Sequence, residues 1–535
     1  MPGYVSGVEV GTGSARAGVF DSAGLMLGAG KHDFRLWQAS AGIAEQSSAE
    51  IWASVCSAVR SALAQAAIDP ASVGGIGFDA TCSLVVLGPG GASLPVGPSE
   101  DPSRDVIVWM DHRALDQAAR INATRHDVLR YVGGVISPEM QTPKLLWLKE
   151  HRPHVFDGAA QFFDLTDFLT WKATGSQARS ACTVTCKWTY LAHERRWDAS
   201  YFRSIGLGEL ADEGFRRIGT AVVDPGTALA DGLTETAAAE LGLPPGVPVA
   251  AGLIDAHAGG VGSVGTEGTP TRSMAYVFGT SSCTMTSTSD PVFVPGVWGP
   301  YYSAMVPGFW LNEGGQSAAG AAMDQLVSFH PAAPEARHAA EAAGRGLLEW
   351  LADQALASAG PSGAGMLADG LHVVPEFLGN RAPFADPHAR AVIAGLGMER
   401  DLASLVSLYV AGLCGLGYGL RQIIEAQQRS GAPIETIVIS GGAGRHPLVR
   451  QVLADAAGTE IAGTAAAEPV LLGSAILGAV AGRVFTDIPA AMRAMSATET
   501  VFRPAEGAMR DWHDARYRAF QALQQAARDP RRPDA

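Results

Sequence analysis

Three aspartates each follow an apolar run directly. Asp79 comes after residues 73–78, Asp111 after 106–110 and Asp255 after 247–254. Apolar runs of this kind predict buried strands, and α/β sheets bind their ligands beyond the carboxyl ends of their strands. A carboxylate at such a place can accept a proton from a reacting group or help to hold a divalent cation. We therefore expect these acids to mark an edge where chemistry takes place.

Two short turns rich in Gly, Thr and Ser lie between strand-like runs. The first spans residues 11–14 between runs 5–10 and 15–21, and the second spans 279–282 between runs 274–278 and 283–286. This pattern predicts two β-hairpins whose turns expose backbone N–H groups. Such N–H groups bind phosphate oxygens, and Thr and Ser hydroxyls add further donors. Either turn alone would be explained as a tight turn.

A third glycine turn, 440–444, follows the apolar run 436–439 and precedes a predicted helix. The three turns together with the acids favour a nucleoside triphosphate site. Neither the GxxxxGK[ST] pattern nor GxGxxG after a first strand is present, which argues against P-loop and Rossmann sites.

The elements around these residues indicate an α/β fold of two lobes. A helix is predicted over 48–66 and from about residue 113, and Ala-rich helices are predicted over 339–359 and 400–429. Strands that alternate with helices are typical of α/β domains, and the repeated hairpin indicates an internal duplication. Glycines and Pro270 at 259–270 predict the boundary and hinge between the lobes.

Seven segments resemble one family in order along residues 5–505. They are 8–16 (VEVGTGSAR), 77–84 (GFDATCSL), 109–113 (WMDHR), 253–260 (LIDAHAGG), 278–282 (FGTSS), 312–317 (NEGGQS) and 377–383 (FLGNRAP). They resemble the FGGY carbohydrate kinases, and most closely the pentulose kinases that phosphorylate ribulose. The resemblance implies two actin-like, ribonuclease-H-like lobes and transfer of a phosphoryl group from ATP, with Mg²⁺, to a terminal sugar hydroxyl. The implied parts are a first lobe over 1–265, a second over 266–505, and a C-terminal helix and frayed tail over 506–535.

The resemblance also assigns roles to individual residues. Asp255 corresponds to the catalytic base, Glu9 and Asp255 to the metal site, and Cys82, Lys187, Asp255 and Glu313 to the sugar site. The nucleotide contacts that it implies are Gly11, Thr12, Gly13, Ser14, Arg16, Gly279, Thr280, Ser281, Gln316, Gly320, Gly441, Gly442, Ala443 and His446.

Two positions depart from the family pattern. Relatives usually carry Asp where Glu9 stands, and often Asn where His446 stands. The longer Glu side chain extends the carboxylate by about 1.5 Å. Because Mg²⁺ usually meets carboxylates partly through water, we expect activity to be retained with altered metal preference.

Lys187 stands out in the composition. The chain has five lysines against 34 arginines, and Lys187 lies among aromatic residues in the segment 186–190, CKWTY. A compact ammonium with three donors suits sugar oxygens, and guanidinium does not replace it. The alternative is an exposed lysine whose stem packs over aromatic rings. Lys144 is expected to have a structural role and not to contact the sugar.

The overall charge limits the partners. A net charge of −14 argues against nucleic acid and against an anionic membrane surface, because both need a basic face. Six cysteines are too few for a disulfide framework, and no apolar run reaches the length of a membrane span. We expect a cytoplasmic enzyme that binds a small sugar and ATP, with a homodimer as the family-level expectation.

Alternative functions stay open at this level. D-Ribulose is the leading substrate, and ribitol, L-ribulose or xylulose are alternatives within the same class. A different class is an ATP-binding regulatory protein on the same scaffold, which the departures at Glu9 and His446 would favour and which Asp255 and Glu313 argue against.

Overall fold

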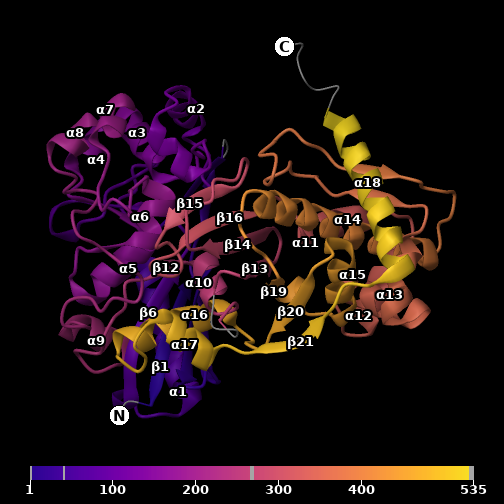
Figure 1. Cartoon of the computed structure of the whole chain (residues 1–535). Coiled ribbons are helices and arrows are strands. Elements are labelled where there is room, and N and C mark those ends of the chain that lie inside the picture. Colours follow the sequence, from indigo (N-terminus) through magenta and orange to yellow (C-terminus); the bar gives the residue numbers. More distant parts are fainter. Residues whose placement is uncertain (1–2, 40–41, 266–269, 529–535) are drawn as a thin grey trace.

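The computed structural model describes residues 3–39, 42–265 and 270–528, which form two lobes (Figure 1). The sheet of the first lobe has the strand order β12-β6-β1-β2-β3. Its strands are β1 (Tyr4–Val10), β2 (Ser14–Asp21), β3 (Met26–Asp33), β6 (Val73–Ala80) and β12 (Leu253–Ile254). β1 pairs antiparallel with β2 and parallel with β6, and β6 pairs parallel with β12. The first predicted hairpin is therefore confirmed.

A second sheet in this lobe corrects one prediction. It has the order β4-β5-β8-β7-β9, and its strands are β4 (Trp37–Ala39), β5 (Ile43–Gln46), β7 (Leu84–Leu87), β8 (Val106–Ile107) and β9 (Gln161–Asp164). The strand predicted over 106–110 is only β8, and it belongs to this sheet. Asp111 consequently does not lie with Asp79 and Asp255. It accepts hydrogen bonds from Ala44 N–H and from the buried Arg113 side chain, which is structural ion pairing.

The sheet of the second lobe repeats the topology of the first. Its order is β15-β16-β14-β13-β19-β20-β21. The strands are β13 (Ser273–Phe278), β14 (Ser282–Thr288), β15 (Trp298–Tyr302), β16 (Trp310–Gln316), β19 (Thr436–Ser440), β20 (Glu460–Thr464) and β21 (Thr498–Phe502). β13 forms a hairpin with β14 and pairs parallel with β19, as β1 does with β2 and β6. The two-stranded pairs are β10 (Arg179–Ser180) with β11 (Val222–Val223) and β17 (His372–Val374) with β18 (Val392–Ala394).

Helices surround both sheets. Those of the first lobe are α1 (Ser48–Ala66), α2 (Leu115–Ala123), α3 (Gln141–His151), α4 (Pro153–Gly158), α5 (Leu165–Thr174), α6 (Ala181–Trp188), α7 (Ala199–Ser204), α8 (Gly208–Asp212), α9 (Glu235–Leu241) and α10 (Asp255–Val261). α1 has the bounds that the sequence predicts. Its N-cap is Ser47, whose hydroxyl accepts from Glu50 N–H, and Ala67 ends it in the left-handed conformation.

The second lobe contains α11 (Gly320–Ser328), α12 (Ala333–Ala342), α13 (Leu347–Gly363), α14 (Leu402–Arg429), α15 (Pro447–Ala457) and α18 (Gly507–Arg528). The helix predicted over 339–359 is divided between α12 and α13, because Gly344 between them takes a positive φ of 67°. Among the described helices, α14 alone is long and apolar enough to cross a membrane, but 72% of its most apolar window is buried in this protein. It is a core helix.

Two late helices return to the first lobe. α16 (Pro469–Ala481) packs against β1 and β6, and α17 (Ile488–Met495) packs against α16, far from most of the chain around them in sequence (Figure 1). Leu471 and Ile476 share one buried cluster with Val5 and Phe20 of the first sheet. The range 266–505 expected for the second lobe therefore contains a segment that covers the first lobe's sheet.

α10 and α16 cross at very short range. A Cβ atom on Gly473 would overlap the carbonyl oxygen of Ala258, and one on Gly262 would overlap that of Pro469. The glycines at 259 and 260, predicted to be irregular, are helical residues of α10. Residues 266–269 of the predicted hinge lie outside the described part of the chain.

We expect Gly473→Ala to lower the free energy of unfolding by about 1–3 kcal/mol, because the added methyl group must push α10 away from α16. Urea denaturation measures the change. Gly158→Ala is the matched control, since a Cβ atom there meets nothing within 4 Å. Equal stabilities of the two variants would contradict the close crossing.

Candidate active site

Three carboxylates meet at the strand ends of the first sheet. Glu9 of β1 pairs in register with Asp79 of β6, Asp79 pairs with Leu253 of β12, and Asp255 begins α10 directly after β12. Burial raises the pKa of Asp79 well above its usual value, and the charges of Glu9 and Asp255 raise that pKa further. The parallel strands thus gather like charges that only a proton or a cation can offset.

Arg16 already binds one of these acids. Its Nη2 lies 2.6 Å from both carboxylate oxygens of Glu9, and its Nη1 donates to Glu468 Oε2 at 2.8 Å. Burial raises the pKa of Glu9 although Arg16 opposes that effect. Arg16, which the sequence predicts to contact the nucleotide, is therefore hydrogen-bonded to Glu9, which the sequence predicts to bind the metal.

The family resemblance assigns the metal site to Glu9 and Asp255 and does not include Asp79, the penultimate residue of β6. Asp79 Oδ2 accepts from Ser474 Oγ at 2.5 Å, whereas its buried Oδ1 has no hydrogen-bond partner in the described part of the chain. A buried carboxylate oxygen without a donor, beside two further carboxylates, is the donor chemistry that Mg²⁺ prefers. The donor type of Glu9, Asp79 and Asp255 fits such an ion. Among the described residues their oxygen atoms do not form a group within 4.8 Å of one another, so they would hold Mg²⁺ partly through water.

A cavity of about 620 Å³ lies between the lobes and contains the predicted sugar site. Cys82, Lys187 and Asp255 line it from the first lobe, and Glu313 lines it from the second. Within the described part of the chain, Lys187 Nζ makes no hydrogen bond or ion pair, and it lies 5.6 Å from the centre of the Trp298 ring. Lys187 is 9% exposed, so the exposed-lysine interpretation is wrong.

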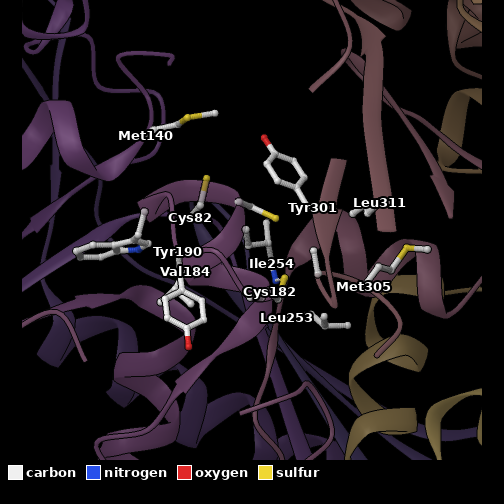
Figure 2. Close-up of a cluster of buried hydrophobic side chains, with 14 of the residues drawn as sticks. Cys82, Met140, Cys182, Val184, Tyr190, Leu253, Ile254, Tyr301, Met305 and Leu311 are labelled. Atoms are coloured by element: carbon white, nitrogen blue, oxygen red, sulfur yellow. Dashed lines mark hydrogen bonds between the residues drawn. The ribbon is translucent and has the colours of Figure 1, made fainter. Parts of the chain in front are cut away.

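Lys144 and Cys82 show two other ways of burying a polar group. Lys144 Nζ donates to the carbonyl oxygens of Val108 and Trp109, which confirms its role in the fold. Burial raises the pKa of the Cys82 thiol to about 12, so this residue shapes the pocket as a neutral group. Figure 2 shows Cys182 and Ile254 between Cys82 on one side and Tyr301 and Leu311 of the second lobe on the other.

Glu313 is held by a histidine that follows the catalytic-base position. His257 Nε2 lies 3.4 Å from Glu313 Oε2, and His257 Nδ1 lies 3.1 Å from Cys182 Sγ. Burial raises the pKa of Glu313, but the charges of Lys187, His257 and Arg381 outweigh it and bring the pKa to about 2. Glu313 is therefore an anion at neutral pH. The donor atoms of Cys182, Cys186 and His257 lie within 4.8 Å of one another, a cluster that the distance between these residues in the sequence conceals.

In both hairpin turns the first glycine donates a backbone hydrogen bond within the turn, across three residues in the first turn and two in the second. Gly11 N–H donates to Ser14 O, and Gly279 N–H donates to Ser281 O, each at 3.0 Å. The N–H groups that follow them, at Thr12 and Gly13 and at Thr280 and Ser281, have no acceptor among the described hydrogen bonds. These groups are available for phosphate oxygens.

A second cavity of about 500 Å³ is lined by Gly320, Gly442 and His446, together with Tyr409. The glycine turn reaches it through Gly442, and the preceding Gly441 takes a φ of +94°, where a Cβ atom would overlap the carbonyl oxygen of Phe278. Gly442, Ala443 and Gly444 form a short 3-10 helix.

Two predicted nucleotide contacts have their polar atoms engaged by the fold. His446 Nδ1 accepts from Leu448 N–H, and its Nε2 lies 3.1 Å from Asp353 Oδ1. Gln316 donates to Leu416 O and accepts from Tyr276 Oη, both at 2.9 Å. His446 lines this second cavity as part of its wall, whereas Gln316 connects β16 to α14.

The chain matches two domains of one family. Residues 4–262 match the N-terminal domain of the FGGY family of carbohydrate kinases, and residues 274–482 match its C-terminal domain. The chain belongs to the FGGY family of carbohydrate kinases. The family and the two-lobe, actin-like fold expected from the sequence are confirmed. It is a phosphotransferase that acts on an alcohol group, and ATP is the phosphate donor expected of this family.

Two proteins of similar sequence and one solved structure show what this FGGY kinase resembles. A human protein described as FGGY carbohydrate kinase domain-containing is 45% identical over 97% of this chain and 96% of its own length. A Saccharomyces cerevisiae protein named D-ribulokinase is 38% identical over 90% of this chain and 72% of its own. The crystal structure of xylulose kinase from Rhodospirillum rubrum superposes with a TM-score of 0.81 at 23% identity and covers 98% of this chain and 99% of its own, which shows the shared fold.

We expect Glu9→Asp to remain active and to lower the Mg²⁺ concentration for half-maximal activity by about 10-fold. The shorter side chain loses the two-oxygen contact with Arg16, whose charge-assisted hydrogen bonds compete with a cation. Mg²⁺ titration of ADP release measures the change. Glu460→Asp, which shortens an exposed partner of Arg503, is the control. Unchanged metal dependence in Glu9→Asp would show that the extra methylene group is irrelevant.

Proposed function

We propose that this FGGY kinase transfers the γ-phosphoryl group of ATP to the terminal hydroxyl of D-ribulose and forms D-ribulose 5-phosphate, with Mg²⁺ bound. The observation that carries the proposal is the buried Lys187 ammonium, which has no hydrogen-bond acceptor among the described residues and lines one cavity with Glu313 and Asp255. A cation and an anion around one cavity suit a ligand with several hydroxyl groups. The D-ribulokinase name of the yeast relative also supports it.

Asp255 is suited to be the general base. Its Oδ1 accepts from Ala256 N–H at 2.7 Å, and its Oδ2 has no partner among the described residues. Burial raises the pKa of Asp255, which makes it a stronger proton acceptor than an exposed aspartate. The proton of the sugar hydroxyl passes to Asp255 while the oxygen forms a bond to phosphorus and the bond from phosphorus to ADP breaks.

The remaining residues position the reactants. Lys187 and Glu313 orient the sugar, and the free N–H groups of the two hairpin turns hold phosphate oxygens. Glu9, Asp255 and Asp79 are the residues that would hold Mg²⁺, which supplies neutralising charge on the phosphates when bound. The two lobes enclose the sugar and exclude water, which favours transfer to the sugar over hydrolysis.

A substrate panel tests the proposal. We expect the highest kcat/KM for D-ribulose among D-ribulose, L-ribulose, xylulose and ribitol, measured by coupled ADP release, with the product identified as the 5-phosphate by ³¹P NMR. A higher kcat/KM for ribitol or xylulose would replace D-ribulose with that alternative. Nucleotide binding without turnover of any sugar would favour the regulatory alternative. A cytoplasmic location and a homodimer stay predictions.

We expect Asp255→Asn to bind the sugar with little change and to lower kcat about 10²- to 10⁴-fold, because the amide cannot accept the proton. Calorimetric titration with sugar separates binding from turnover. Asp157→Asn, on the exposed side of α4, is the control. Near-normal kcat in Asp255→Asn would exclude Asp255 as the base.

A further inference from the structure

Two thiols and an imidazole that the proposed reaction does not use meet next to the sugar cavity. Cys182 and Cys186 lie on α6, and His257 lies on α10 two residues after Asp255. All three are fully buried, and their donor atoms lie within 4.8 Å of one another. No other group of three His, Cys, Asp or Glu side chains in the described part of the chain comes as close together.

The spacing of the two cysteines favours a metal ion over a disulfide. Residues four apart on a helix lie on the same face, with their Cβ atoms about 5–6 Å apart. A disulfide requires a Cβ–Cβ distance of about 3.5–4.5 Å, so Cys182 and Cys186 cannot form one without distorting α6. Three residues between two cysteines is a spacing found among zinc ligands, because an ion between the sulfur atoms spans the longer distance.

The two nitrogen atoms of His257 face different partners. Nδ1 lies 3.1 Å from Cys182 Sγ, and Nε2 lies 3.4 Å from Glu313 Oε2. A histidine that binds a metal through one nitrogen usually donates its other N–H to a carboxylate, which fixes the ring and its proton. Cys182 Sγ in turn accepts from Ile254 N–H at 3.3 Å. The groups that support metal ligands are therefore already in place around these side chains.

The donor set selects the ion. Two sulfur atoms and one imidazole nitrogen suit Zn²⁺, whereas Mg²⁺ prefers oxygen ligands. Ligand atoms of a tetrahedral zinc ion are about 3.4–3.8 Å apart, so Cys182 Sγ and His257 Nδ1 need to separate by only a few tenths of an ångström. The two positive charges of Zn²⁺ also cancel those of two thiolates, which matters in a site closed to solvent.

We propose that Cys182, Cys186 and His257 bind one Zn²⁺ ion through their Sγ, Sγ and Nδ1 atoms. Each thiol releases its proton to solvent on binding, and one position of the ion remains for a further ligand. The ion joins α6 to α10 and keeps the His257 proton on Nε2, where it is donated to Glu313. This zinc site is structural and is separate from the Mg²⁺ of phosphoryl transfer, so it does not depend on which sugar is phosphorylated.

The test uses the full chain, stripped of metal by a chelator, kept reduced with a phosphine and titrated with Zn²⁺ in excess Mg²⁺. We expect one equivalent of Zn²⁺ per chain, measured against a coloured competing chelator, and a melting temperature that rises with Zn²⁺. Co²⁺ in place of Zn²⁺ should give thiolate-to-cobalt charge-transfer absorption, which ligation by carboxylates or imidazole alone does not produce.

Variants locate the ion. Cys186→Ser should lose the equivalent of Zn²⁺ and the cobbalt absorption band. Glu313→Gln keeps all three ligands but removes the carboxylate behind His257, and it should weaken Zn²⁺ binding about 10- to 100-fold. Cys414→Ser, which changes a buried thiol of α14 outside the cluster, is the matched control and should bind Zn²⁺ as the wild type does.

Two results would overturn the zinc site. One is a wild-type protein that binds no Zn²⁺ or that binds Co²⁺ without thiolate absorption, a measurement that needs no variant to fold. The other is a folded Cys186→Ser protein, checked by circular dichroism, that binds Zn²⁺ as tightly as the wild type. Cys186→Ala replaces Cys186→Ser if the latter is unfolded.

Discussion

The close crossing of α10 and α16 determines the geometry on which the active site depends. Gly262 and Gly473 lack side chains where the two helices meet, so α16 can lie against both α10 and the strands β1 and β6. This packing fixes the first turn of α10, and with it Asp255, at the ends of those strands. It also places Ser474 of α16 against Asp79. Strand pairing places Glu9 beside Asp79, and this contact between distant segments positions Asp255 relative to them.

The charged ligands of this protein must be bound by local groups. The chain carries a net charge of −14, so no general positive field attracts an anionic triphosphate. Phosphate binding must come from the free N–H groups of the hairpin turns and from a cation between the acids. In the sugar cavity, Lys187 and Arg381 lie on either lobe beside one tryptophan, Trp298. A ligand that joins the two lobes there would favour their closure over it.

Sequence patterns predicted local elements better than side-chain roles. The hairpins and α1 follow from alternation and capping, which act within a few residues. Asp111 satisfies the same pattern as Asp79, but β8 joins another sheet, and its carboxylate binds Arg113 instead of a ligand. Gln316 lies in a family motif, yet the fold engages both ends of its amide. Strand partners and hydrogen-bond partners are tertiary properties, and neither is encoded in the spacing.

The sequence by itself determined the family, the two-lobe fold, the glycine turns and the acid at position 255, because these depend on short motifs with local physical causes. Only the tertiary structure decided that Lys187 is buried with no acceptor among the residues described, that Arg16 is bound to Glu9, and that Arg381 and Glu139 line one cavity from different lobes. Burial and long-range charge depend on which distant segments pack together, and isolated residues such as Arg381 and Glu139 carry no local signal of that packing.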